Sequence, residues 1–169
     1  MIIEICGQET AVSLIAEARE RTSVISITST EDADIAFPAN ENVASILRLR
    51  FNDLTEAWDE EGFPYGRPLP EQRDFVGLRA FVEALYGERL IVHCWEGASR
   101  SAAVATAVFE SRGRVDRLET HCRYAPNSRV YALACRELGI PLRGLNYRAV
   151  PDGEDTWRIE SGPEIPVWH

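Results

Sequence analysis

Short hydrophobic runs alternate with amphipathic segments along this chain. The short runs predict strands at residues 2–6, 24–27, 47–51 and 90–92. The amphipathic segments predict helices at residues 10–21, 70–86, 101–111, 116–124 and 127–138. Because strands that alternate with helices form parallel sheets, we expect an α/β fold in which helices flank a central, mostly parallel sheet.

Two of the predicted strands differ in their pattern. Residues 90–92 are entirely apolar, which is typical of a central parallel strand. In residues 47–51 the apolar positions alternate with Arg48 and Arg50, which is typical of a strand with one solvated face. The alternative is that these two arginines line the substrate entrance, but the alternation favours a position on the solvated face.

The composition indicates one folded domain. The chain has 169 residues, 45% of them hydrophobic, and shows neither an internal repeat nor a linker between two parts. We assign residues 1–148 to a single globular domain and residues 149–169 to a C-terminal tail or edge extension. Proline, glycine and acidic residues dominate from about Tyr147, and residues 157–159 predict an edge strand.

Acidic residues exceed basic ones. The chain has 27 Asp and Glu residues against 18 basic residues, a net charge of −9, and every basic residue is arginine. An acidic surface repels nucleic acid and anionic lipid, so we expect neither a nucleic acid nor a membrane as a partner. The absence of lysine excludes mechanisms that use a Schiff-base or P-loop lysine.

Neither a signal peptide nor a membrane span is expected. The apolar runs are far shorter than the roughly 20 residues that cross a bilayer. The first residues lack the basic start and long apolar stretch of a secretory signal. We therefore expect a cytoplasmic protein, and the sequence does not indicate its oligomeric state.

The cysteines do not have the spacing of a metal site. No two of them form a CxxC pair, and only three histidines are present, so we expect neither a metal nor another cofactor. In a reducing cytoplasm the thiols are expected to be free. The four cysteines are Cys6, Cys94, Cys122 and Cys135.

The candidate chemistry lies in residues 93–101, between the apolar strand and a helix rich in small residues. A loop at this position can direct successive backbone N–H groups into one concavity, and the following helix adds its positive dipole end. Gly97 allows the backbone angles of a tight loop, and Arg100 offers a planar fork that matches two phosphate oxygens. The same positive field favours the thiolate form of Cys94. The residues expected to bind phosphate are Trp95, Glu96, Gly97, Ala98, Ser99 and Arg100.

These residues resemble a known signature. The stretch His93 to Ser101 is similar to the HCxxGxxR[S/T] motif of the cysteine-dependent protein tyrosine phosphatases, in the HCxxGxSRS form of dual-specificity members. Residues 51–54 (Phe-Asn-Asp-Leu) resemble the acid-bearing loop of small tyrosine-phosphatase-like proteins from bacteria. Residues 123–138 resemble the end of the dual-specificity fold. The resemblance covers residues 46–139, and it makes residues 1–148 the expected catalytic domain, with a dual-specificity phosphatase-like fold.

The resemblance implies a metal-independent phosphatase that hydrolyses phosphate monoesters. Cys94 would attack phosphorus to form a cysteinyl-phosphate, while Arg100 and the loop amides hold the phosphate oxygens. Asp53 would act as the general acid and then as the base that activates water. Ser101 would donate a hydrogen bond to the departing thiolate, and His93 would support the loop from behind.

Several alternatives stay open. Asp59 is the rival of Asp53 for the general acid, because 41 residues separate Asp53 from Cys94, more than is usual in dual-specificity enzymes. Cys122 is either a resolving thiol that protects Cys94 in a disulfide or simply a packed residue. Other function classes are a catalytically weak module that binds phosphoproteins and an oxyanion enzyme similar to rhodanese or arsenate reductase.

The substrate is expected to carry a single phosphate. The variable loop positions are Trp95, Glu96, Ala98 and Ser99, and none is basic, so a multiply phosphorylated ligand would meet repulsion. The expected partner is a protein or peptide that carries phosphotyrosine. If specificity is dual, proteins or peptides that carry phosphoserine or phosphothreonine are expected as well.

Overall fold

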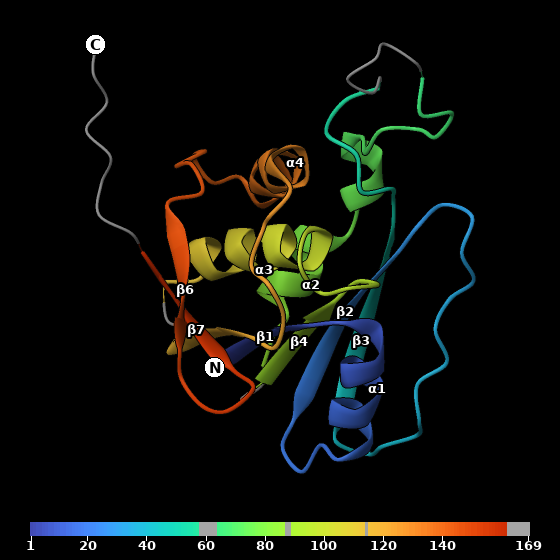
Figure 1. Ribbon diagram of the computed structural model, residues 1–169. Helices are drawn as coiled ribbons and strands as arrows, with labels where there is room; N and C mark the ends of the chain where they lie inside the picture. The colour runs from blue at the N-terminus through green and yellow to red at the C-terminus, as the bar shows by residue number, and fades with distance from the viewer. Residues whose placement is uncertain (58–63, 87–88, 114, 162–169) are drawn as a thin grey trace.

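One mixed sheet organises the molecule (Figure 1). The structure is a computed structural model, which describes residues 1–57, 64–86, 89–113 and 115–161 of the chain. The strand order of the sheet is β3-β2-β4-β1-β5-β7-β6. The strands from β3 to β5 run parallel, whereas β7 and β6 are antiparallel to their neighbours. The strands are β1 (Ile2–Cys6), β2 (Thr22–Thr28), β3 (Val43–Arg50), β4 (Arg89–His93), β5 (Arg117–Thr120), β6 (Tyr147–Pro151) and β7 (Trp157–Ser161).

Helices cover both faces of this sheet (Figure 1). One face packs against α3, and α4 packs on α3 in turn, with α2 and the 3₁₀ helix η1 beside them; the other face packs against α1. The alternation along β4 explains the two layers, because Leu90 and Val92 belong to the core under α3 while Ile91 belongs to the core under α1. The helices are α1 (Gln8–Ala16), η1 (Gln72–Phe75), α2 (Leu78–Glu83), α3 (Arg100–Ser111) and α4 (Ser128–Leu138).

The predicted α/β architecture with a mostly parallel sheet in one domain is therefore confirmed. Every predicted strand is present, and β4 is the middle strand of the parallel part, as its apolar run indicated. The helix predicted at residues 127–138 is α4, and the Asn127 side chain caps it by accepting a hydrogen bond from Val130 N at 3.0 Å. Gly139 ends α4 in the left-handed conformation, with φ of 70°.

The helix predicted at residues 116–124 is wrong, because this segment contains strand β5. Leu118 and Thr120 are buried while Arg117 and Glu119 are more exposed, which is the period of two of a strand. Pairing with β1, in which Ile3 lies opposite Leu118, decides the conformation in place of the local helical pattern.

Two other helices differ in extent from the sequence prediction. The helix predicted at residues 70–86 is divided into η1 and α2, because Gly77 between them has φ of 93°. The helix predicted at residues 10–21 spans only Gln8–Ala16, since the Asn40 side chain donates hydrogen bonds to the carbonyl groups of Ile15, Ala16 and Ala18 and so caps its C-terminal end.

The C-terminal strands extend the same sheet. The strand predicted at residues 157–159 is β7, but it lies between β5 and β6, so β6 and not β7 forms the edge. Residues 162–169 of the predicted tail lie outside the described residues. Within the part of the chain that is described, no helix has the length and apolar character needed to cross a membrane.

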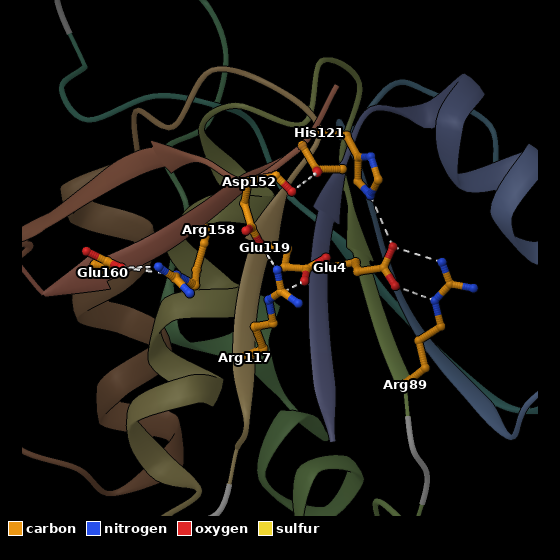
Figure 2. Close-up of polar contacts among 9 residues, drawn as sticks. Glu4, Arg89, Arg117, Glu119, His121, Asp152, Arg158 and Glu160 are labelled. Atoms are coloured by element: carbon orange, nitrogen blue, oxygen red, sulfur yellow. Dashed lines mark hydrogen bonds and ion pairs between the residues drawn. The ribbon is translucent and has the colours of Figure 1, made fainter. Parts of the chain in front are cut away.

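Charged side chains occupy the part of the α1 face that lies over β1, β5 and β7 (Figure 2). Glu4 on β1 accepts a hydrogen bond from Arg89 Nη2 at 2.8 Å and pairs with His121 Nε2 at 3.1 Å. Burial raises the pKa of Glu4, but hydrogen bonds from His121 and Arg89 outweigh it and lower the pKa to about 2. Glu4 is therefore ionised at neutral pH and stabilises this side of the sheet.

Candidate active site

The loop between β4 and α3 lies at the carboxyl edge of the sheet. His93 ends β4 and lies opposite Cys6 of β1 and Ser26 of β2, so three strands end near the loop. Open α/β sheets bind ligands at this edge. The loop starts with Cys94 and leads into α3, which begins at Arg100.

Gly97 allows the loop to pack against the start of α1. Its φ is 81°, and a Cβ atom here would lie 2.4 Å from the carbonyl carbon of Cys6 and 2.5 Å from the backbone nitrogen of Gly7. Gln8 N also donates a hydrogen bond to Trp95 O at 3.1 Å. Only glycine fits this backbone conformation and this close approach, which gives the sequence motif its physical reason.

Cys94 lies at the base of the site and is 2% exposed. Its Sγ is 3.2 Å from Ser101 Oγ, which comes from the first turn of α3. A hydroxyl group at this distance can donate a hydrogen bond to a thiolate sulfur. The motif residues Cys94 and Ser101 are thus in direct contact.

Arg100 is held at one nitrogen and leaves other donors available. The residue is 6% exposed, and Nη1 donates to Phe51 O and to Ser29 Oγ, each at 3.1 Å. Nε is buried and has no hydrogen-bond partner within the described residues. A buried guanidinium donor without a partner is suited to an anion that binds in the adjacent cavity.

Asp53 reaches the same site from the loop after β3. Its Oδ1 accepts hydrogen bonds from Ser99 Oγ and from Asn127 Nδ2, each at 2.8 Å, and its Oδ2 is 3.9 Å from Arg100 Nε. The carboxylate is therefore fixed beside the loop that carries Cys94. Asp59, the alternative general acid, lies outside the described residues.

These side chains surround a cavity of about 270 Å³. Three carboxylates line it together with a single guanidinium group, so its walls are acidic around one strong anion-binding group. The cavity is lined by Cys94, Trp95, Glu96, Ser99 and Arg100 from the predicted loop, by Asp53, and by Ser29 and Asp32 from the segment after β2.

The remaining motif residues lie around this cavity without lining it. His93 is fully buried, and its ring packs edge-on against Phe37 with 5.5 Å between ring centroids. Burial lowers the pKa of His93 to about 4, so the imidazole is neutral at pH 7. Gly97 and Ala98 complete the loop backbone, and Ala98 O accepts a hydrogen bond from Ala125 N at 3.0 Å.

Three residues of the site were missed by the sequence analysis. Ser29 and Asp32 follow β2, and the sequence signal for them was only that this strand also ends at the carboxyl edge. Asn127 begins the helix predicted at residues 127–138 and caps it, and its amide nitrogen also holds Asp53. Sequence spacing does not indicate this second contact, because 74 residues separate the two.

All four cysteines are free, and Cys122 is half-buried after β5, where burial raises the pKa of its thiol. Its redox role stays a prediction.

Within the described ranges, no three His, Cys, Asp or Glu side chains are grouped so that they could hold a metal ion.

Arg48 and Arg50 are on the exposed side of β3, where both pair with Asp34.

Comparisons of the chain with protein-family models, with curated proteins and with solved structures found no match in any of the three.

Proposed function

We propose that this chain is a metal-independent phosphatase that hydrolyses phosphate monoesters through a cysteinyl-phosphate. The observation that carries the proposal is the contact of Ser101 with buried Cys94, which lines a cavity together with Arg100, whose Nε has no hydrogen-bond partner among the described residues. A nucleophile, a hydroxyl group that can stabilise its thiolate and a guanidinium group for the phosphate are the groups that this chemistry needs.

In the first step, the Cys94 thiolate attacks phosphorus and an S–P bond forms. The bond between phosphorus and the leaving oxygen breaks, and Asp53 gives its proton to that oxygen. Arg100 and the backbone N–H groups of the loop stabilise the charge on the phosphate oxygens.

In the second step, water attacks the phosphorus of the cysteinyl-phosphate and gives a proton to Asp53. The S–P bond breaks, inorganic phosphate leaves, and the electron pair returns to Cys94 Sγ. Ser101 donates a hydrogen bond to this thiolate, which makes sulfur a better leaving group. Each group needed for the two steps is among the residues that surround the cavity.

The site supports a singly phosphorylated substrate. Asp32, Asp53 and Glu96 line the cavity, and their charges disfavour further phosphate groups near the first. We infer that the substrate is phosphotyrosine in a protein or peptide, with phosphoserine and phosphothreonine as further substrates if specificity is dual.

The family assignment is part of the same proposal. A Cys-Arg loop after the middle strand of a parallel sheet, followed by a buried helix, supports a dual-specificity member of the cysteine-dependent protein tyrosine phosphatases. A cytoplasmic location is proposed with it, because reducing conditions keep the Cys94 thiol available.

Hydrolysis of para-nitrophenyl phosphate tests the proposal. We expect the wild type to release nitrophenol in the presence of EDTA, vanadate to inhibit it, and both Cys94→Ser and Arg100→Ala to lose it. Cys135→Ala is the matched control, because it removes a buried thiol in α4 that does not line the cavity. Turnover that persists in Cys94→Ser, or that needs a metal ion, would overturn the mechanism.

Binding without turnover would change the function class. If a phosphotyrosine peptide binds, is not hydrolysed, and is lost in Arg100→Ala, the chain is a phosphoprotein-binding module. If it neither binds nor hydrolyses phosphate esters, sulfur transfer from thiosulfate is the activity to measure next.

A further inference from the structure

A second cavity, of about 500 Å³, adjoins the proposed catalytic cavity. Asp32, Trp95 and Arg100 line both, so the two cavities meet at these side chains. The rest of the second cavity comes from α1, from the end of β2 and from the loop that follows β2. A group held in the second cavity would therefore belong to the part of a substrate next to its phosphorylated residue.

The walls of this cavity combine apolar and acidic groups. Val12, Ile27 and Ile35 supply apolar surface, and Asp32 and Asp34 supply carboxylates. Asp34 is already neutralised, since its Oδ1 lies 2.7 Å from Arg50 Nη2.

The Asp32 carboxylate makes no ion pair within the described part of the chain, where it accepts one hydrogen bond, from Ser29 N at 3.3 Å. Arg50 Nη1 donates to the backbone oxygen of Asp32 and not to its carboxylate. Because Asp32 lines both cavities, its negative charge lies next to the position of a neighbouring substrate group. A cationic group of the substrate would provide the missing partner.

Trp95 favours a planar cationic group. The residue is 66% exposed and lines both cavities. An exposed indole attracts a cation to its ring face, and a planar guanidinium stacks there while its N–H groups still reach a carboxylate. An aliphatic stem that ends in a guanidinium group thus matches the apolar wall, the indole and the carboxylate together.

We propose that the second cavity binds an arginine side chain that neighbours the phosphorylated residue of the substrate. The inference rests on the proposed function and narrows its substrate class to phosphotyrosine peptides with an adjacent arginine. The overall charge agrees with this direction of preference, because a chain with a net charge of −9 repels acidic peptides. A third cavity, on another side of Trp95, is also acidic, with Glu9 and Glu96 in its lining.

Matched phosphotyrosine peptides test this inference. The peptides share one neutral sequence and carry arginine, lysine, alanine or glutamate at the residue before or after phosphotyrosine, and phosphate release gives kcat/KM for each. We expect arginine on at least one side to raise kcat/KM by about 5- to 10-fold over alanine, a change of about 1 kcal/mol. Lysine should raise it less, and glutamate should lower it.

Two variants connect the preference to the cavity. The ratio to compare is kcat/KM for the arginine peptide divided by kcat/KM for the alanine peptide. In Asp32→Asn this ratio should fall toward one. In Trp95→Ala the same ratio should fall, and so should the preference for the arginine peptide over the lysine peptide. Asp155→Asn is the matched control, because it removes one exposed acidic charge outside every residue set that lines these cavities. Its ratio should equal that of the wild type.

The outcomes separate this inference from the proposed function. Equal kcat/KM for the four peptides, with hydrolysis intact, would overturn the arginine site and leave the phosphatase in place. If no peptide is hydrolysed, the proposed function fails, and calorimetric binding of the same peptides decides the arginine site. Tighter binding of the arginine peptide that is lost in Asp32→Asn would support it, and equal binding would overturn it.

Discussion

Asn127 Nδ2 donates a hydrogen bond to Asp53 Oδ1 at 2.8 Å, and Asn127 Oδ1 accepts one from Val130 N at 3.0 Å. One side chain therefore caps α4 and fixes the carboxylate that we propose as the general acid. Ser99 Oγ donates to the same Oδ1 at 2.8 Å, so the acid is attached to the catalytic loop as well as to the helix.

Asn127→Ser separates the two roles of this side chain. Serine keeps the helix cap, because its hydroxyl group can still accept from the first turn, but it lacks an amide that reaches Asp53. We expect kcat to fall about 10-fold for phenyl phosphate, whose leaving group needs a proton, and much less for 2,4-dinitrophenyl phosphate. An equal loss for both substrates would mean that Asn127 acts on stability or on the nucleophile instead.

Asp53→Asn should show the same dependence on the leaving group with a larger amplitude. The amide cannot supply a proton, so we expect turnover of para-nitrophenyl phosphate at acidic pH to fall by about 100-fold or more. Asp59→Asn is the comparison, because Asp59 is the rival acid in the sequence. Full turnover in Asp53→Asn together with a loss in Asp59→Asn would transfer the role to Asp59.

Gly97→Ala tests the packing of the loop on the β1–α1 junction. The added Cβ would lie 2.4 Å from a backbone carbon of Cys6, and alanine at φ of 81° is strained in addition. We expect the free energy of unfolding to fall by about 3 kcal/mol, and phosphatase activity to be lost in the fraction that remains folded. Gly113→Ala is the control, since nothing lies within 4 Å of a Cβ there. Urea unfolding of both variants measures the difference, and equal stability would contradict the assigned role of Gly97.

The sequence was sufficient where a pattern is local. Strands with continuous or alternating apolar residues, such as β4 and β3, were predicted because their period fixes which side chains are buried. Asp53 follows the strand predicted at residues 47–51 and Cys94 the one predicted at residues 90–92, and parallel strands end at one edge of a sheet, so the sequence is enough to bring these two residues to the same edge.

The sequence was insufficient where distant segments decide the conformation. Residues 116–124 have a helical pattern, but pairing with β1 makes Arg117–Thr120 a strand. The segment after β2 has no periodicity, so nothing local predicted that Ser29 would hold Arg100 or that Asp32 would line the cavity. These contacts depend on tertiary packing and not on propensity.

Acidification should destabilise the fold through His93 between pH 6.5 and 4. Burial lowers the pKa of His93 from 6.5 to about 4, so the unfolded chain binds this proton first and the stability present above pH 6.5 is lost as pH falls. We expect a loss of about 2 kcal/mol between pH 7 and pH 5 from this group. Urea unfolding at both pH values should show that His93→Phe, which keeps a ring against Phe37, lacks this part of the loss. The same pH dependence in both proteins would contradict the prediction.

Glu4 should act in a lower pH window and through a different set of contacts (Figure 2). Hydrogen bonds from His121 and Arg89 outweigh the effect of burial and lower its pKa from 4.5 to about 2, so its contribution is present above pH 4.5 and is lost as pH falls toward 2. At pH 7, Glu4→Leu leaves Arg89 without its main partner, and we expect the free energy of unfolding to fall by about 3 kcal/mol.

The double variant Glu4→Leu/Arg89→Met distinguishes a paired charge from simple packing. Removing both charges leaves no uncompensated guanidinium, and replacement of a buried pair by apolar residues is often close to neutral. We therefore expect the double variant to be more stable than Glu4→Leu alone in urea unfolding at pH 7. If the loss of stability in the double variant instead equals the sum of the losses in Glu4→Leu and in Arg89→Met, the pair contributes nothing beyond the separate packing of its members. The low pKa of Glu4 must then be due to His121.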